Sequence, residues 1–165
     1  MIKPVQSLQV FYNEQLVGTL ALRRDNLCAF EYSAQWLEEG FSISPLLIPL
    51  KPGVFTSKWD PFDGLFGVFN DSLPDGWGRL LIDRLLRQQG INPATLSPLD
   101  WLCIVGPKTM GALTYHPTHP IGQDDQNKTL AYLEQETQKV LHDEPTKDLS
   151  LLAAKGGSSG GARPK

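Results

Sequence analysis

The stretch that decides the fold is LQVFYNEQLVGTLAL, residues 8–22. Apolar or aromatic residues recur at every second position from Leu8 to Tyr12. A period of two is typical of a β-strand that buries one face. The polar residues 13–15 favour a turn, and a second apolar run follows at Leu16–Leu22. We therefore expect the chain to begin with two antiparallel strands joined by this turn.

Extended structure continues beyond this pair of strands. The next strand is expected at Cys28–Tyr32, after a polar turn, and further extended segments at Phe41–Ile48 and Met110–His116. Residues 55–70 are rich in glycine and aromatic residues. We expect an irregular packed loop there, with a short helix at about Phe66–Phe69.

Capping residues mark the helices. Ser33 and Gly40 bound a segment long enough for one helical turn. Asp75 is a suitable N-cap for a longer helix that ends at Gly90. That helix has a broad apolar face made of Trp77, Leu80, Leu81, Ile82, Leu85 and Leu86.

The next helix has the clearest start. Ser97 caps it, Pro98 occupies its first turn and Asp100 completes a pattern like a capping box. Two more helices are expected, across residues 128–142 and from Thr146 or Asp148 to Ala154. The fold class is therefore α+β: an antiparallel β-rich N-terminal lobe with three to four helices and a mobile glycine-rich C-terminal tail.

Composition excludes several classes of protein. The 165 residues are 41% hydrophobic and 20% charged, a globular balance, and 15 glycines with 13 prolines are too many for a helical bundle. The net charge of −3 argues against a strongly basic nucleic-acid-binding surface. Cys28 and Cys103 are far apart and indicate a reduced protein. No signal-like or membrane-spanning apolar stretch occurs, so a cytoplasmic location without membrane contact is expected.

Two segments could carry a function. Residues 156–165, GGSSGGARPK, could let backbone N–H groups approach a phosphate, but they lack the Walker pattern and equally fit a flexible linker. In residues 73–79, Asp75 and Trp77 suit helix initiation, and the alternative is a docking surface that includes Asp75, Trp77 and Arg79.

Other sites of chemistry lack support in the sequence. His116 and His119 have no third metal ligand close in sequence, so no metal site is expected. The sequence contains none of the His-Arg-Asp, Asp-Phe-Gly or Val-Ala-Ile-Lys motifs of kinases. The chain itself is therefore not expected to transfer a phosphoryl group.

Six segments, taken in order, point to one family. They are VFY to VGTL (10–20), FEY to WL (30–37), ISPL (43–46), FNDSLPDGWGR (69–79), LCIVG to MGAL (102–113) and GGSSGGARPK (156–165). Together they resemble the N-terminal region of the HipA family, the serine/threonine kinase toxins of type II toxin–antitoxin modules associated with persistence. The leucine-proline-aspartate-glycine segment and the glycine-rich end are the most specific matches.

The resemblance implies roles for particular residues. The β-rich lobe would pack against a kinase core, and a glycine-rich loop would cover ATP, with Mg as the second cofactor of the full-length protein and no cofactor in this chain. Ser158, with Ser159 beside it, would match the site of autophosphorylation. The ATP-binding loop would contain Gly160, Gly161, Ala162, Arg163, Pro164 and Lys165.

The resemblance also implies partners. The kinase target would be a translation factor such as an aminoacyl-tRNA synthetase. The protein partner would be a HipB-like helix-turn-helix antitoxin, and contact with operator DNA would be indirect, through that antitoxin. Docking on the kinase core or on a kinase partner would involve Asp75, Trp77 and Arg79.

The large kinase core has no counterpart in this sequence, which leaves two main hypotheses. In the first, the chain is the non-catalytic N-terminal lobe of a HipA-type kinase toxin, inactive alone. It would divide into a β-rich subdomain with helices (1–116), a helical segment leading to the core (117–155) and the start of the phosphate loop (156–165). In the second, it is a stand-alone antitoxin-like module that restrains a separate kinase. The glycine-rich end favours the first, and a generic small domain with a disordered tail is a third alternative.

Overall fold

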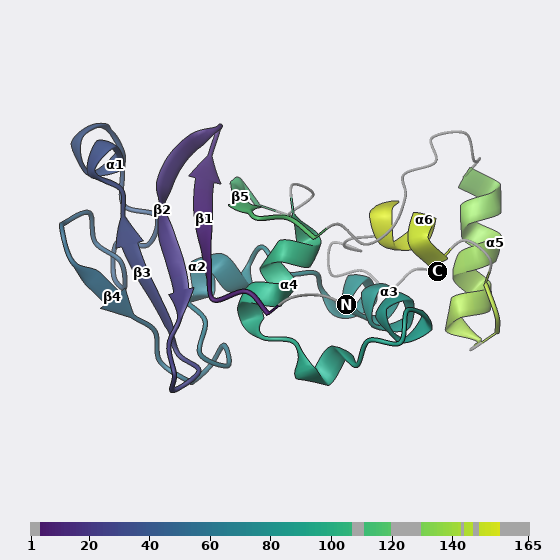
Figure 1. Cartoon of the computed structure of the whole chain (residues 1–165). Coiled ribbons are helices and arrows are strands. Elements are labelled where there is room, and N and C mark those ends of the chain that lie inside the picture. Colours follow the sequence, from purple (N-terminus) through teal and green to yellow (C-terminus); the bar gives the residue numbers. More distant parts are fainter. Residues whose placement is uncertain (1–3, 107–110, 120–129, 143, 147–148, 156–165) are drawn as a thin grey trace. The chain divides into compact units, whose positions relative to one another are not determined.

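The computed structural model describes residues 4–106, 111–119, 130–142, 144–146 and 149–155 (Figure 1). The chain divides into two compact units. The first contains residues 1–73 and 96–120, and the second contains residues 74–95 and 121–165. The units alternate along the chain, whereas the domains expected from the sequence are consecutive. The expected domain boundaries at 116 and 155 stay a prediction.

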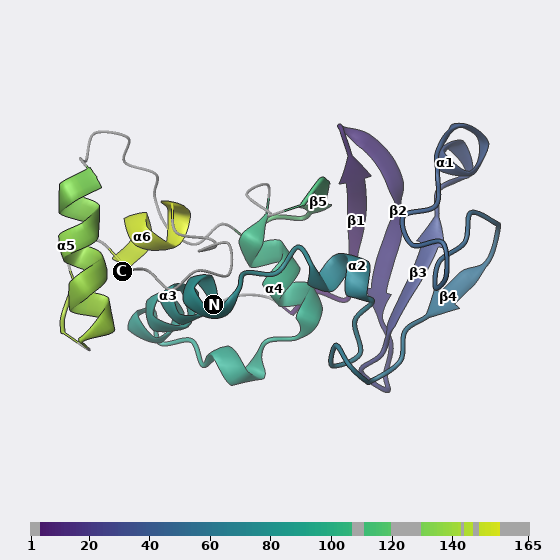
Figure 2. The same cartoon turned by 180° about the vertical axis from the view of Figure 1, so that it is seen from behind.

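The first unit is built on a five-stranded antiparallel sheet (Figures 1 and 2). Its spatial order is β4-β3-β2-β1-β5, so the last strand in the chain pairs with the first. The two outer strands are therefore β4 and β5. The strands are β1 (Ser7–Tyr12), β2 (Gln15–Leu22), β3 (Cys28–Tyr32), β4 (Val54–Thr56) and β5 (Leu113–His116).

Three helices belong to the first unit: α1 (Ala34–Glu39), α2 (Gly67–Asn70) and α4 (Pro98–Val105). The Ser33 side chain accepts a hydrogen bond from the Trp36 N–H and so caps α1. A complete capping box, expected from the sequence, begins α4.

The core of the first unit lies between the sheet and the two helices α2 and α4. Alternate residues of the strands, such as Val10, Leu20 and Phe30, are fully buried. Phe30 contacts Phe69 of α2 with the ring centroids 5.3 Å apart, and Phe69 contacts Tyr115 of β5 at 6.4 Å. This row of aromatic rings links elements distant in sequence into one apolar cluster.

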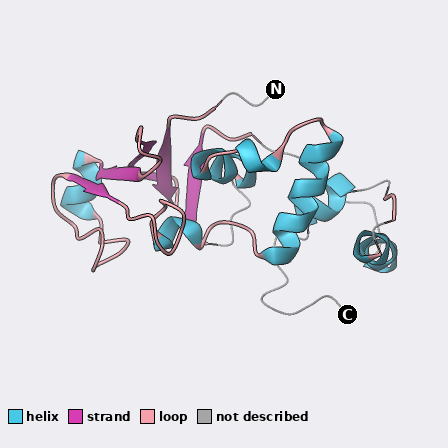
Figure 3. Ribbon diagram, turned by 90° about the horizontal axis from the view of Figure 1, so that it is seen from below, coloured by secondary structure: helices cyan, strands magenta, loops and turns pink. Residues whose placement is uncertain are grey.

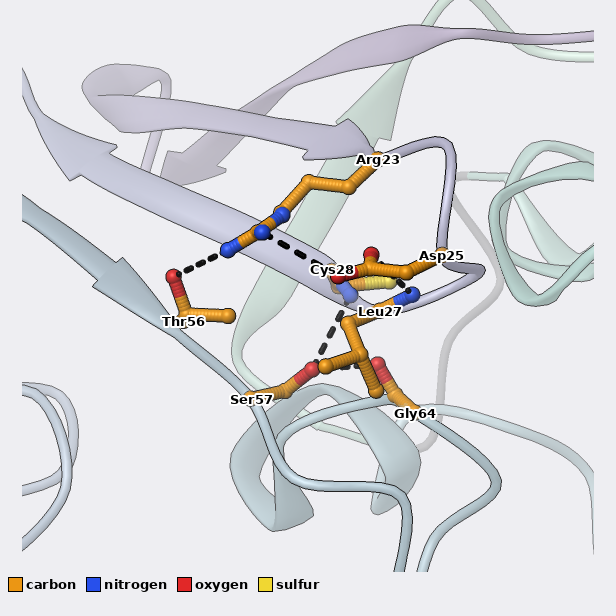
Figure 4. Close-up of polar contacts among 7 residues, drawn as sticks. All are labelled: Arg23, Asp25, Leu27, Cys28, Thr56, Ser57 and Gly64. Atoms are coloured by element: carbon orange, nitrogen blue, oxygen red, sulfur yellow. Dashed lines mark hydrogen bonds and ion pairs between the residues drawn. The ribbon is translucent and has the colours of Figure 1, made fainter.

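A buried serine ties the loop after β4 to the sheet (Figure 4). The Ser57 hydroxyl accepts a hydrogen bond from the Cys28 N–H at 2.9 Å and donates to the Gly64 carbonyl at 2.5 Å. The guanidinium of Arg23, in the turn between β2 and β3, donates to the Thr56 hydroxyl of β4 at 3.1 Å. These contacts hold the short edge strand β4, which has only three residues.

The second unit consists of helices and loops in the described residues (Figure 3). Its elements are α3 (Gly76–Gln88), the 3₁₀ helix η1 (Pro93–Thr95), α5 (Leu130–Leu141) and α6 (Leu149–Lys155). They share a smaller apolar cluster of Leu81, Leu85, Val140, Leu149 and Leu152.

The α+β fold class is confirmed, with six α-helices in the described residues. The helical turn expected between Ser33 and Gly40 is present as α1, and the short helix expected at about Phe66–Phe69 is present as α2. The expected number of three to four did not count these two short elements. The extended segment expected at Phe41–Ile48 is wrong, since it holds only an isolated bridge between Ser44 and Ile48. The strand β4 was missed because three residues show no readable period. The glycine-rich tail lies outside the described residues.

Both cysteines are buried, and burial raises the pKa of each thiol to about 12, with the charge of Asp100 adding to the effect at Cys103. We expect iodoacetamide at pH 8 to leave Cys28 and Cys103 unmodified in the folded protein and to alkylate both in urea, because only the thiolate reacts. Mass spectrometry of the quenched reaction measures this. Rapid alkylation of the folded protein would contradict it.

The same pKa shift makes stability depend on pH. An unfolded cysteine titrates near 9.0, whereas the folded thiols stay protonated up to about 12. The folded state therefore holds more protons between these two values, and the free energy of unfolding falls as the pH rises above 9.

Candidate functional site

The sequence-predicted docking residues lie at the start of α3. The Asp75 carboxylate accepts a hydrogen bond from the Gly78 N–H at 3.1 Å, and its backbone is extended, as an N-cap requires. An acidic side chain here also lies at the positive end of the helix dipole. Helix initiation by Asp75 is thus confirmed.

Trp77 contributes to the packing of the second unit. Its side chain is partly buried and packs against the cluster that includes Leu81 and Leu85 of the same helix. The indole therefore stabilises the helical unit. Because it is not fully covered, part of Trp77 stays accessible to a partner.

Arg79 lies on another side of the helix. Two residues correspond to a rotation of about 200° in an α-helix, so Arg79 and Trp77 have different surroundings. The Arg79 Nε lies 3.4 Å from the Asp83 Oδ1, one turn further along α3. Burial lowers the pKa of the Arg79 guanidinium, and the charge of Asp83 opposes that shift. The Arg79 side chain is 42% exposed, so it presents a positive charge at the surface.

The predicted nucleotide-binding and phosphorylation residues cannot be placed beside this helix. The predicted phosphorylation residues, Ser158 and Ser159, lie outside the described residues. So do the predicted nucleotide-binding residues, which are Gly160, Gly161, Ala162, Arg163, Pro164 and Lys165. Their roles stay predictions from the resemblance.

A hollow that sequence reasoning missed lies in the first unit, between the β1–β2 turn and α1. We call it the turn cavity. It has a volume of about 360 Å³, and its lining includes Phe11, Glu14, Gln35, Trp36 and Glu39. No sequence signal links these residues, because the turn and the helix meet only when the Ser33 hydroxyl donates to the Leu16 carbonyl at 2.8 Å.

A second, more open hollow of about 410 Å³ occurs in the helical unit. It lies between the C-terminal half of α3 and the residues that precede α6, and it is lined in part by Arg84, Arg87, Glu144 and Thr146. Its lining thus contains both basic and acidic side chains.

The two histidines considered as metal ligands, His116 and His119, both contact other residues of the first unit. The His116 ring contacts the Phe11 ring edge-on, with centroids 5.1 Å apart. The backbone N–H of His119 donates to the Cys103 carbonyl at 2.8 Å. Within the described residues, no three His, Cys, Asp or Glu side chains gather as a metal site would require. In the same part of the chain, no helix is both long and apolar enough to cross a membrane.

Comparison with known proteins gives the family. Residues 8–116 match the model of the HipA N-terminal domain. None of the curated proteins matches. One similar solved structure is the complex of HipA, HipB and operator DNA from the Shewanella oneidensis MR-1 toxin–antitoxin system, with 20% identity and a TM-score of 0.48. That similarity covers 84% of this chain and 29% of the other, so the chain spans less than a third of the solved protein.

The region matched by the family model covers well over half of the chain. It begins at the second residue of β1 and ends at the last residue of β5, and so contains nearly the whole sheet of the first unit. This chain belongs to the HipA N-terminal domain family.

Proposed function

We propose that the chain is the N-terminal lobe of a HipA-type serine/threonine kinase toxin. The observation that carries the proposal is the family match over residues 8–116, which contains nearly the whole five-stranded sheet and the helices α1 to α4. In this role the lobe is structural and regulatory. The sequence carries none of the catalytic-loop or metal-binding motifs of a kinase, so phosphoryl transfer would depend on a kinase core.

The cofactors of that activity would be ATP and Mg. Gly160–Lys165 would then contribute backbone N–H groups to the ATP phosphates, as successive amides in a glycine-rich loop can. Ser158 or Ser159 would accept a phosphate from the kinase. A phosphoserine adds a charge of about −1.5 to −2 and would repel ATP from the same loop, which switches the kinase off.

The partners follow from the same proposal. A HipB-like helix-turn-helix antitoxin would bind the toxin and connect it to operator DNA. The substrate class would be a translation factor, with an aminoacyl-tRNA synthetase as the first candidate. In the alternative form of the proposal, the lobe is a separate antitoxin-like chain, and its partner is the kinase itself.

Phosphate mapping tests the regulatory part of the proposal. In the protein produced from its own locus together with an active kinase, phosphate is expected on Ser158 or Ser159. The double change Ser158→Ala and Ser159→Ala is expected to abolish it, whereas the control Ser150→Ala leaves it unchanged. Phosphopeptide mass spectrometry measures the outcome. A natural protein that carries no phosphate on Ser158 or Ser159 beside the active kinase, or carries phosphate only elsewhere, would contradict the assignment.

Arg79 tests the docking surface. We expect Arg79→Ala to weaken binding of the HipA-type kinase core by about tenfold, because interface arginines often contribute more than 1 kcal/mol. The change also removes the ion-pair partner of the Asp83 Oδ1, a buried atom, so we expect a loss of stability of about 1–3 kcal/mol beside the loss of binding. Calorimetry measures the binding, and denaturation in urea measures the stability.

The matched control is Arg87→Ala, which removes the same charge from an exposed position in the last turn of α3. Equal affinity of the Arg79 variant and the natural protein would remove Arg79 from the proposed interface.

A further inference from the structure

The turn cavity has two walls, one formed by the β1–β2 turn and the other by α1. On one side, Asn13 and Glu14 form the two-residue turn between β1 and β2, with φ angles of 45° and 68°. A shift of register at Val10/Phe11 pairs Phe11 with Leu16, and both residues line the cavity. Such bulges redirect side chains at the ends of strands.

On the other side, α1 is held firmly. The Ser33 N–H donates to the Val17 carbonyl at 2.9 Å, and the Trp36 Nε1 donates to the Phe41 carbonyl at 2.9 Å. Gly40 lies directly on the Trp36 ring, where an added Cβ would approach ring atoms to 2.5 Å. The aromatic floor of the cavity is therefore fixed before any ligand binds.

The chemistry of the walls selects the charge of a ligand. Glu14 and Glu39 supply two carboxylates from opposite sides, and Gln15 and Gln35 supply amides. No lysine or arginine lines the cavity. Glu14 also occupies a left-handed turn position that glycine or asparagine would adopt at lower cost, so the carboxylate is present there despite its backbone preference.

We propose that the turn cavity binds the arginine side chain of a basic segment of a partner protein. A guanidinium can pair with carboxylates through two parallel hydrogen bonds, and its apolar stem suits the partly exposed Phe11 side chain in the lining. The volume of about 360 Å³ lies near the lower end of the range of about 300–1,000 Å³ for ligand sites, which suits a single side chain. The net charge of −3 opposes occupation by a second copy of this chain. The inference rests on the first unit alone and is independent of the kinase assignment.

The test uses the full chain labelled with ¹⁵N and titrated with N-acetyl-arginine N-methylamide. We expect saturable changes in the NMR signals of the Glu14 and Gly40 amides and of the Trp36 indole N–H. The citrulline counterpart has nearly the same shape without the charge and should bind at least about fivefold more weakly. Added salt should weaken the arginine probe, because exposed charges are screened.

Variants locate the binding. Glu14→Gln and Glu39→Gln should each weaken the arginine probe by about two- to fivefold, the range of exposed ion pairs. The matched control is Glu38→Gln, which removes an exposed charge from the same helix outside the cavity lining and should retain binding.

Three results would overturn the proposal. The first is equal binding of the citrulline probe. The second is equal weakening by Glu38→Gln and by the two cavity variants. The third is a change in the cavity signals with protein concentration when no probe is present, which would assign the cavity to a second copy of the chain.

Discussion

Replacing Asp100 with alanine is expected to lower the free energy of unfolding by about 3 kcal/mol. Asp100 is only 3% exposed, and its two carboxylate oxygens serve different parts of the first unit. The Oδ1 atom accepts from the Val5 N–H at 2.9 Å, and the Oδ2 atom accepts from the N–H and hydroxyl of Ser97 at 2.9 and 2.7 Å. One side chain therefore fixes the start of α4 and anchors the chain just before β1.

The size of the effect follows from the donors left behind. Removing one partner of a buried hydrogen bond costs about 1–3 kcal/mol for each unsatisfied group, and loss of a helix cap costs about 0.5–2 kcal/mol. Denaturation in urea, followed by tryptophan fluorescence, measures the change. Asp100→Asn retains one acceptor oxygen and is expected to lose about half as much. A loss below about 1 kcal/mol in the alanine variant would show that water replaces the carboxylate.

A methyl group at position 18 is expected to destabilise the protein by about 3 kcal/mol, at the upper end of the range for overpacking. The Cβ of Gly18→Ala would lie 2.1 Å from the Glu31 carbonyl oxygen and 2.8 Å from the Phe30 ring. The carbonyl belongs to the paired strand β3 and cannot rotate away without breaking the β2–β3 pairing.

Gly76→Ala is the matched control for that change. An added Cβ there has no neighbour within 4 Å, and alanine favours a helix by up to about 1 kcal/mol over glycine. The same urea experiment should show unchanged or slightly increased stability for Gly76→Ala. Equal stability of the Gly18→Ala variant and the natural protein would contradict the close packing of β2 on β3.

The elements that sequence reasoning predicted well are those with local signals. The alternation from Leu8 to Tyr12 and the apolar run to Leu22 are confirmed as β1 and β2. The caps at Ser33, Asp75 and Ser97 are also confirmed, since each cap depends on residues only three positions away.

Contacts between distant residues were not predictable in the same way. The Asp100 side chain bonds Val5, which lies 95 positions away, and the pairing of β1 with β5 closes a comparable distance. The turn cavity likewise depends on the bond between Ser33 and Leu16 across two strands. No periodicity or motif in a single sequence encodes such approaches. For the predicted docking residues, the structure explains Asp75 and Trp77 locally, whereas docking itself stays a proposal.

The most direct test of the central claim is purification of this protein from its own locus through a tag, with its intact mass and bound proteins measured. The account predicts that a HipA-type kinase core is present. It would occur either in the same polypeptide, with a mass well above 18.3 kDa, or as a stoichiometric partner of an 18.3 kDa chain. An 18.3 kDa chain that purifies without a kinase, from cells in which a HipA-type kinase is expressed, would contradict the account.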